Sequence, residues 1–563
     1  MKKKPVLLAL ALLLPRAGRA ENPPDPPRLS GAVETSVLEL DAVVTDKDGR
    51  PVSGLKASDF AVRVGGKTVP IENFYERRTL PAGAAEPGTP APAEPAALLA
   101  PTAAGLRRPP RHLVLFLDRL YLWDKWKSDA AFDALRDILH RMVAEPGDDA
   151  MIVTWDRAVG ALVPFTSDLA SLERLLEKER IRSRQPRPEE TTIRLLEDEA
   201  RWFATNPVSS GTEPRTGTGT GMATGMGTGT GGVEVSQRAA QAEAYAAMRS
   251  KAAALKAVCD AVGGLPGRKV LVHASHRFSR IAGLEFSAGG LDAQEFNAMA
   301  LVESVAEAAN ANGVTMYTFF PEGWNEDAMP LAPGLSDAEV HNEGAALEVL
   351  ADRTGGTFSL GWREGPALAA RVVEDVESSY SLGVAASGRK PGASQAVKVT
   401  VRNPSLTVRA RRTALERTPE ERVEARVLSN LFRPEPPSRL RLSLDSASVE
   451  AAKKKATATL HLRVPIAGLV KTPTARGASG AFSVFVVSAG ADGSFSEVVR
   501  QRRPFEIPKA DADRASAGHF TYEVPVVVGA GEARISVGVW DEVGKDAGFL
   551  LVEVRDGQAS VRR

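Results

Sequence analysis

The amino-acid sequence predicts a mixed α/β fold, in which a mainly parallel sheet flanked by helices stands between a small N-terminal β module and a C-terminal antiparallel β sandwich. Continuous apolar runs alternate with helical periodicity over residues 112–385, as in a sheet covered on both faces. Short alternating strands separated by glycine-rich turns fill residues 435–558, a pattern typical of a sandwich. A chain of 563 residues is also too long for one hydrophobic core, so we expect several domains.

The start of the chain has the pattern of a secretory signal peptide. Three lysines at positions 2–4 precede an apolar run over 6–14, and small residues end at Ala20. This apolar run is too short to cross the roughly 30 Å of a bilayer's hydrocarbon as a helix. We therefore expect residues 1–20 to be a cleaved signal peptide and the chain to be exported to the periplasm or the extracellular space, with no membrane span. The alternative interpretation is an apolar, unstructured start.

A small β module is predicted over residues 33–76. Apolar residues alternate along 38–44, which is the period of a half-buried strand, and Asp48-Gly49 supplies a turn. Two more strands are expected over 60–64 and 69–74. Residues 77–111 consist largely of Ala, Pro, Gly and Glu, a composition that buries too little apolar surface to fold, so we expect a linker there.

In the core, over residues 112–385, expected strands and helices alternate, which favours a parallel sheet with helices on both faces. The first helix is expected to begin at Ser128, a good N-cap residue. Residues 207–233 are rich in Gly and Thr but lack the Lys-Ser/Thr of a phosphate-binding loop, so we expect a flexible insertion. The expected strands are 113–117, 150–155, 161–165, 269–272, 314–320 and 356–360, and the later helices are 169–178, 235–262, 292–312 and 343–353.

After the core we expect a β extension and linker over 386–434 and the sandwich over 435–558. Apolar and polar residues alternate along 456–464, and four further strands follow with similar patterning. These strands are expected at 482–487, 520–528, 535–540 and 549–554.

Composition limits the possible functions. Lys and Arg number 71 against 70 Asp and Glu, which argues against the strongly basic class of nucleic-acid-binding proteins. A single cysteine, Cys259, excludes an intramolecular disulfide and a cysteine-rich metal site. Leu255 and Val262 share its helical face, so we expect Cys259 to be a small buried apolar residue and not a nucleophile.

Six short motifs follow one another along the chain: VVTDKDGRPV at 43–52, VTWD at 153–156, FTSD at 165–168, LPGRK at 265–269, LADRTGG at 350–356 and SYSLG at 379–383. Together and in this order they resemble the von Willebrand factor type A domains of divergent, secreted bacterial proteins, a type best known from acidobacteria. The resemblance implies a Rossmann-like sheet and, through the wider family, the binding of protein ligands. It covers most of the chain, and the C-terminal sandwich least.

The resemblance also implies a metal-ion-dependent adhesion site, from which this chain departs. In the family an Asp-x-Ser-x-Ser loop holds Mg²⁺ or Mn²⁺, together with a Thr and an Asp from two other loops. Asp118 is in place, but Leu120 and Leu122 stand at the hydroxyl positions and Arg119 adds positive charge. We therefore expect no metal ion and no other cofactor, and we expect Asp118 to cap its loop or to pair with Arg119.

The remaining family positions are matched weakly. Thr191 or Thr192 corresponds to the loop Thr, and Ala274-Ser275-His276 stands where the second Asp would be. His273 and His276 end a strand, without the helix and the intervening Glu of a zinc signature, so we expect loop-edge histidines and no zinc.

The sequence predicts no catalytic residue. It contains no nucleophile elbow, no phosphate-binding motif and no dinucleotide fingerprint. The carboxylate pairs Glu189-Glu190 and Asp148-Asp149 fall in loops or turns and are expected to be solvated. His461 lies on the polar face of a strand and is expected to be exposed.

Trp123 and Trp126 follow the Asp118 loop, where they either contact a ligand or bury the top of the sheet. By analogy of fold, we expect a non-enzymatic binding or adhesion protein that contacts a protein partner through the loops at the carboxyl ends of the strands. The alternatives are a cell-envelope scaffold without a defined ligand, or a hydrolase with an unrecognised site. The partner's identity and the oligomeric state stay open.

Overall fold

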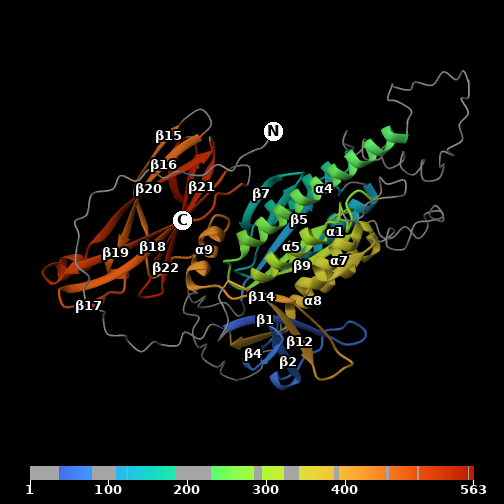
Figure 1. Cartoon of the computed structure of the whole chain (residues 1–563), viewed down its shortest axis with the longest axis horizontal. Helices are drawn as coiled ribbons and strands as arrows, with labels where there is room; N and C mark the ends of the chain where they lie inside the picture. The colour runs from blue at the N-terminus through green and yellow to red at the C-terminus, as the bar shows by residue number, and fades with distance from the viewer. Residues whose placement is uncertain are drawn as a thin grey trace, which may run out of the picture.

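The computed structural model describes residues 37–78, 109–122, 125–185, 230–284, 295–321, 342–385, 392–451, 455–490, 494–529, 531–555 and 557–562. Within them the predicted mixed α/β class is confirmed, with one sheet that contains parallel strands and several antiparallel sheets. Figure 1 shows a helix-flanked sheet in the centre, the blue N-terminal strands below it, and the orange and red C-terminal sheets beside it.

The central sheet has six strands in the order β10-β9-β8-β5-β6-β7. Its first five strands in this order run parallel, and β7 pairs with β6 in the antiparallel sense. The strands β6 and β7 follow β5 on one side, whereas β8, β9 and β10 lie on the other, so the chain order reverses beside β5. The strands are β5 (Arg111–Asp118), β6 (Asp149–Trp155), β7 (Val159–Thr166), β8 (Arg268–Ala274), β9 (Val314–Phe320) and β10 (Phe358–Leu360).

Helices cover both faces of this sheet, as the apolar strands predict. Leu115 points into one core with residues of α1, α2 and α8, and Phe116 points into the other with residues of α4, α5 and α7. The helices are α1 (Lys125–Met142), α2 (Leu169–Ser183), α4 (Thr230–Val262), α5 (Met299–Ala311), α7 (Asn342–Thr354) and α8 (Gly365–Glu377).

The helix boundaries differ from the expected ones in three places. Ser128 is buried inside α1, which begins at Lys125, so Ser128 is not the N-cap residue. α5 begins at Met299 and not near residue 292. α4 begins at Thr230, within the expected insertion, and residues 207–229 lie outside the described part of the chain, as do most of the expected linker and residues 1–36.

The N-terminal β module contains strands from two distant segments. One sheet has the order β13-β1-β11-β4 and the other β14-β12-β2-β3. Residues 394–415, expected to belong to an extension and linker, therefore complete the module that begins the chain. The strands are β1 (Val37–Thr45), β2 (Phe60–Val64), β3 (Lys67–Val69), β4 (Ile71–Arg78), β11 (Ser378–Ala385), β12 (Ser394–Val401), β13 (Thr407–Ala410) and β14 (Thr413–Leu415).

The rest of the expected linker forms helix α9 (Pro419–Asn430), which begins with a capping box between Thr418 and Glu421. α9 packs on α4 and on strands of the C-terminal region. That region has a three-stranded antiparallel sheet and a second antiparallel sheet around β18, which share one core. Its strands are β15 (Ser443–Ala451), β16 (Lys455–Pro465), β17 (Thr472–Thr474), β18 (Gly477–Gly490), β19 (Val499–Pro508), β20 (His519–Gly529), β21 (Ala533–Asp541), β22 (Ala547–Arg555) and β23 (Gln558–Arg562).

Among the described helices, none combines the length and the apolar character that a membrane crossing requires.

Candidate functional site

Asp118 ends β5 at the carboxyl edge of the central sheet, and its side chain is fully buried. Its Oδ1 accepts hydrogen bonds from the backbone N–H groups of Leu120 and Tyr121, both at 3.1 Å. Its Oδ2 accepts a hydrogen bond from the hydroxyl of Ser275 at 2.6 Å. Asp118 therefore caps the loop that follows β5, which is one of the two roles expected for it.

Lys251, on α4, supplies the charge that Asp118 requires. Its ammonium forms an ion pair with Oδ2 of Asp118, and both side chains have an exposed fraction of 0%. The Nζ atom also donates to the backbone carbonyl of Arg277 at 2.7 Å and to the Ser275 hydroxyl at 3.3 Å. Three acceptors for one nitrogen match the three N–H groups of an ammonium.

Aromatic rings surround the Lys251 ammonium. Its Nζ lies 4.7 Å from the ring centre of Tyr121, 5.1 Å from that of Trp155 and 5.0 Å from that of Phe278. Each distance is within the range of a cation–π contact. Burial lowers the pKa of Lys251, and the negative charge of Asp118 opposes this effect.

The alternative expectation, that Asp118 pairs with Arg119, is wrong. Arg119 pairs instead with Glu179 on α2, and its Nε lies 2.6 Å from the Oε2 atom of that carboxylate. Glu179 is buried, so this pair anchors the loop after β5 to α2. Sequence spacing favoured the adjacent residue, but the Arg119 side chain reaches α2 and not Asp118.

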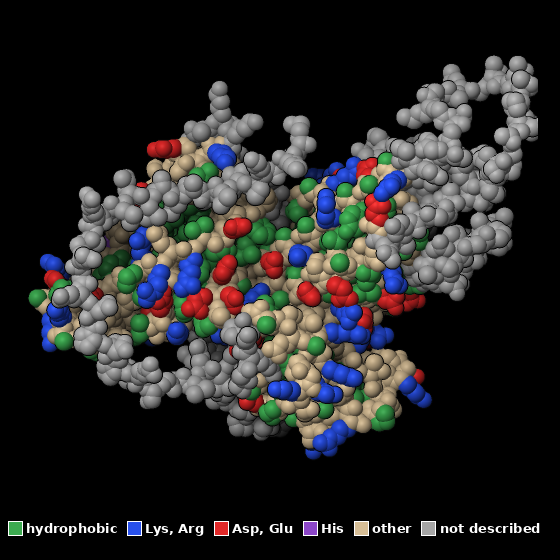
Figure 2. All heavy atoms as spheres, in the orientation of Figure 1, with side chains coloured by type: hydrophobic (Ala, Val, Ile, Leu, Met, Phe, Trp, Pro, Cys, Tyr) green, Lys and Arg blue, Asp and Glu red, His purple; other side chains and the backbone are tan. Residues whose placement is uncertain are grey.

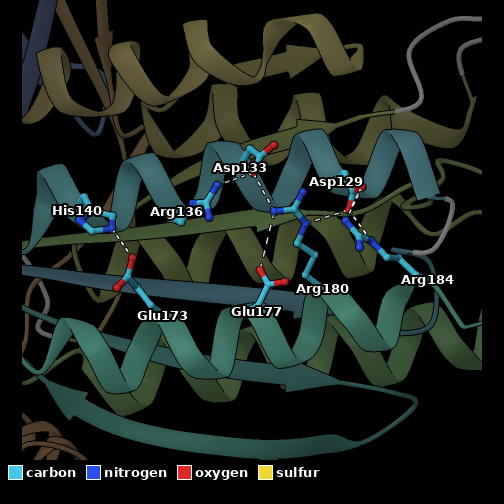
Figure 3. Close-up of polar contacts among 8 residues, drawn as sticks. All are labelled: Asp129, Asp133, Arg136, His140, Glu173, Glu177, Arg180 and Arg184. Atoms are coloured by element: carbon cyan, nitrogen blue, oxygen red, sulfur yellow. Dashed lines mark hydrogen bonds and ion pairs between the residues drawn. The ribbon is translucent and has the colours of Figure 1, made fainter.

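A row of charged contacts holds α2 against α1 (Figure 3). Arg180 lies 3.0 Å from Asp129 and 3.1 Å from Asp133, and Arg184 lies 2.7 Å from Asp129. Exposed pairs of this kind each contribute about 1 kcal/mol or less. They lie beside the apolar packing of Leu172 and Leu176 against α1, on the same helix that carries Glu179.

The donor set around Asp118 does not fit a divalent cation. Leu120 and Leu122 are buried at the positions where the resemblance implies hydroxyl ligands, and the ammonium of Lys251 stands against the carboxylate. One carboxylate and one hydroxyl are too few oxygens for Mg²⁺, which gives up its water reluctantly. Among the described residues, no group of three or more His, Cys, Asp or Glu side chains is placed to hold a metal ion.

Of the two histidines expected at the loop edge, His276 lies there, just beyond the end of β8, whereas His273 lies within the strand. Both side chains are buried. Burial and the nearby charge of Lys251 lower the pKa of His273 to about 4, so this imidazole is neutral at pH 7. Its Nδ1 lies 3.3 Å from the carbonyl oxygen of Phe116, which gives it a structural role between two strands.

Asp148 and Asp149 are buried, so the solvated position expected for them is wrong. Asp149 lies 2.6 Å from Nδ1 of His112 and accepts a hydrogen bond from Arg433 at 2.5 Å. Arg433 is far away in the sequence, so the pattern around Asp149 contains no sign of this partner. These contacts fix the amino ends of β5 and β6, away from the Asp118 edge.

The remaining candidates divide into two groups. Cys259 is buried, and burial raises the pKa of its thiol, which agrees with a small apolar core residue. His461 is half-buried and not exposed. The outcome for four other predictions lies outside the described residues, namely Glu189-Glu190, Thr191 or Thr192, Trp123, and the side chain of Trp126.

Sequence reasoning missed two residues at this edge. The sequence does contain a sign of Lys251's role, because this charged residue interrupts the apolar face that Met248 and Leu255 form on α4. Trp362 follows β10 with an exposed fraction of 49%, and the guanidinium of Arg363 lies 5.0 Å from its ring centre. Both belong to the edge where the parallel strands end.

Comparison with known proteins gives distant likenesses only. No protein-family model and no curated protein matches the chain. An aerotolerance-related membrane protein from Bacteroides fragilis is 10% identical, with 47% of this chain and 98% of that chain covered and a TM-score of 0.21. BatB from Bacteroides thetaiotaomicron is 9% identical, with coverage of 48% and 99% and a TM-score of 0.21. The pilus adhesin SpaC from Lactobacillus rhamnosus is 7% identical, with coverage of 94% and 72% and a TM-score of 0.26. TM-scores this low support no argument about function.

Proposed function

We propose that this chain is an exported, non-enzymatic binding protein with a von Willebrand A-like domain. In this proposal it recognises a protein partner at the carboxyl edge of the central sheet without a divalent cation. The observation that carries the proposal is the buried ion pair between Lys251 and Asp118. A tethered ammonium replaces the metal ion that the family resemblance implies.

Electrostatics support a cation-independent edge. A divalent ion at Asp118 would stand within a few ångströms of the ammonium, where repulsion between the two cations is strong in a buried site. The ion would also have to displace the hydrogen bond from Ser275. In this proposal the Asp118 carboxylate is neutralised when the chain folds. The shape of the edge therefore does not depend on Mg²⁺.

The place of the edge in the fold supports recognition there. The chain order reverses beside β5, and ligands of open α/β sheets bind at the carboxyl ends of strands where the order reverses. This step is an analogy of fold. Trp362 and Arg363 add an exposed aromatic–cationic pair beside β10, and Trp and Arg are frequent anchors of protein interfaces.

The surface charge suits a protein partner. On the face in Figure 2, acidic and basic side chains are interspersed over the core and the sandwich. A nucleic-acid-binding face instead gathers Lys and Arg into one broad patch.

The experiment is capture of partners from the native cell envelope with the purified mature chain, in Mg²⁺ and in EDTA. We expect one stoichiometric partner that is retained equally in both buffers. Trp362→Ala should reduce its capture about tenfold or more, because interface tryptophans often contribute 2 kcal/mol or more. The matched control is Tyr75→Ala, an exposed aromatic residue (41%) of the N-terminal module, which should leave capture unchanged.

Three outcomes would contradict the proposal. Loss of partner capture in EDTA would show that binding requires a divalent metal ion. Many weak partners or none would favour the scaffold alternative. Turnover in a substrate screen by the purified chain, abolished by a point substitution, would favour the hydrolase alternative.

A further inference from the structure

A cavity of about 350 Å³ lies at the end of the central sheet opposite to Asp118. Its walls come from the starts of β8 and β9, from β1 and β13 of the N-terminal module, and from the segment that leads into α9. The volume is at the lower end of the range for small-molecule sites. The cavity therefore lies where three parts of the chain meet.

The walls of this cavity are strongly basic. Seven Lys and Arg side chains line it, against three carboxylates, those of Glu39, Asp41 and Glu416. Such an excess contrasts with the near-neutral composition of the whole chain. The positive charge is thus concentrated in one half-open cavity.

Three of the seven cations are neutralised by carboxylates. Arg77 and Arg268 lie 2.8 Å and 2.6 Å from Asp41, and Arg409 lies 2.6 Å from Asp375. Burial raises the pKa of Asp41, but the attraction of Arg268 and Arg77 outweighs this effect and holds the pKa at about 2. Both oxygens of Asp41 are therefore already paired, Oδ1 with Arg77 and Oδ2 with Arg268.

Four cations remain without an ion pair among the described residues: Lys269, Arg411, Arg417 and Arg422. Three of them donate to neutral groups, with Lys269 at 3.0 Å from the carbonyl of Leu265, Arg411 at 2.9 Å from that of Asn310, and Arg417 at 2.5 Å from the side chain of Asn312. The Nε atoms of Arg411 and Arg422 are buried and have no hydrogen-bond partner in the part of the chain that the structure describes.

Burying a cation without an ion-pair partner is costly, and carboxylates farther away offset only part of this cost. Burial lowers the pKa of Arg411 and of Arg417. Burial, together with the charge of Arg411, lowers the pKa of Lys269 to about 8. An anion in the cavity would supply the negative charge that these four cations lack at contact distance. It would also accept hydrogen bonds from their unused N–H groups.

We propose that this cavity binds a small multivalent oxyanion, that is, a molecule carrying phosphate or carboxylate groups, against Lys269, Arg411, Arg417 and Arg422. Guanidinium groups match the oxygen geometry of both classes and form charge-assisted pairs with them. The size of the cavity favours a small molecule over a nucleic-acid strand. Because it lies at the opposite end of the sheet, the site is independent of the proposed recognition edge.

The experiment measures thermal melting and calorimetric binding of the mature chain with pyrophosphate and, in parallel, with citrate. Sodium chloride at equal ionic strength is the reference. A ligand that binds only the folded chain raises its melting temperature. We expect a saturable rise with at least one of the two probes, and the stronger one identifies the phosphate or the carboxylate class.

Two variants test the residues. Arg417→Gln and Arg422→Gln should each weaken binding about tenfold, the equivalent of one charge-assisted hydrogen bond. Neither should lower the melting temperature of the free chain by much, because each removes a half-buried cation that has no ion pair within the described residues. Arg402→Gln, an exposed arginine outside the cavity, is the control of equal charge and should bind like the wild type.

A third measurement does not depend on variants. Tungstate soaked into wild-type crystals should appear in anomalous maps beside Arg417 and Arg422. Shifts no larger than those in sodium chloride, an equal loss of binding in Arg402→Gln, or tungstate elsewhere only would overturn the proposal. Duplex DNA that binds as tightly as pyrophosphate would overturn the small-molecule assignment.

Discussion

At the scale of single residues, the ion pair of Lys251 with Asp118 determines what the carboxyl edge of the sheet can do. Removing two charges from water is costly, and their attraction offsets the cost only with good geometry and further hydrogen bonds. Here Ser275, two backbone N–H groups and three aromatic rings supply those contacts. The sequence could identify Asp118, but it could not identify its partner, because α4 is brought beside β5 only by the fold.

Lys251→Met tests this pair. The substitution keeps the apolar stem and leaves the Asp118 carboxylate buried without a counter-charge, so the free energy of unfolding should fall by about 3–5 kcal/mol. Lys251→Met combined with Asp118→Asn should recover much of that loss, because neither charge remains. Urea unfolding measures both effects.

Lys256→Met is the matched control, a half-buried lysine of the same helix that has no ion pair within the described residues. It should change the free energy of unfolding by about 0.5 kcal/mol or less. If Lys251→Met were as stable as the wild type, the pair would have no role in holding this edge.

His273 gives the same region a pH dependence. Burial and Lys251 hold its pKa at about 4, below the 6.5 of an ordinary histidine. The unfolded chain therefore binds more protons between these values, so the stability that His273 contributes is present above pH 6.5 and is lost as the pH falls to about 4. The loss from this residue should be up to about 3 kcal/mol.

The measurement is the free energy of unfolding against pH for the wild type, His273→Gln and His461→Gln. Between pH 6.5 and 4 the His273→Gln profile should be flatter than that of the wild type, and the His461→Gln profile should follow the wild type. Parallel profiles for all three proteins would mean that His273 is not held neutral by its surroundings.

At the scale of elements, local pattern predicted strands well where both faces are apolar. The expected strand over 314–320 coincides with β9. Its side chains are buried on both faces of the sheet, so the sequence there is a mainly apolar run that predicts a strand. Local pattern could not predict the pairing between distant segments. For example, β2 pairs with β12, and neither sequence contains a feature that identifies the other as its partner.

Helix α9 is a different case, because its signal was present in the sequence. Thr418, Pro419 and Glu421 form the pattern of a capping box with proline at the first helical position. The expectation of a linker over residues 386–434 did not use this pattern. The helix matters for the fold because Asn430 at its end donates a hydrogen bond to Ser536 of β21 at 2.9 Å.

At the scale of the whole molecule, the central sheet presents two different chemical surfaces at its two ends. The carboxyl edge is neutralised internally by a lysine–aspartate pair, whereas the amino end borders a cavity in which Arg411, Arg417 and Arg422 have no ion pair within the described residues. The family resemblance implied a site at the first end alone, although residues of the LPGRK and LADRTGG motifs line the cavity at the second. The second depends on β1 and β13 of the N-terminal module, on the starts of β8 and β9 and on the segment that leads into α9, which the fold brings together from three parts of the chain.

The most direct test of the cation-independent edge is a crystal structure of the chain grown in millimolar Mn²⁺, with anomalous maps recorded at the manganese edge. We expect no manganese peak within coordination distance of Asp118 and the Lys251 ammonium seated on that carboxylate. A manganese ion bound to Asp118, with Lys251 displaced from it, would contradict the account.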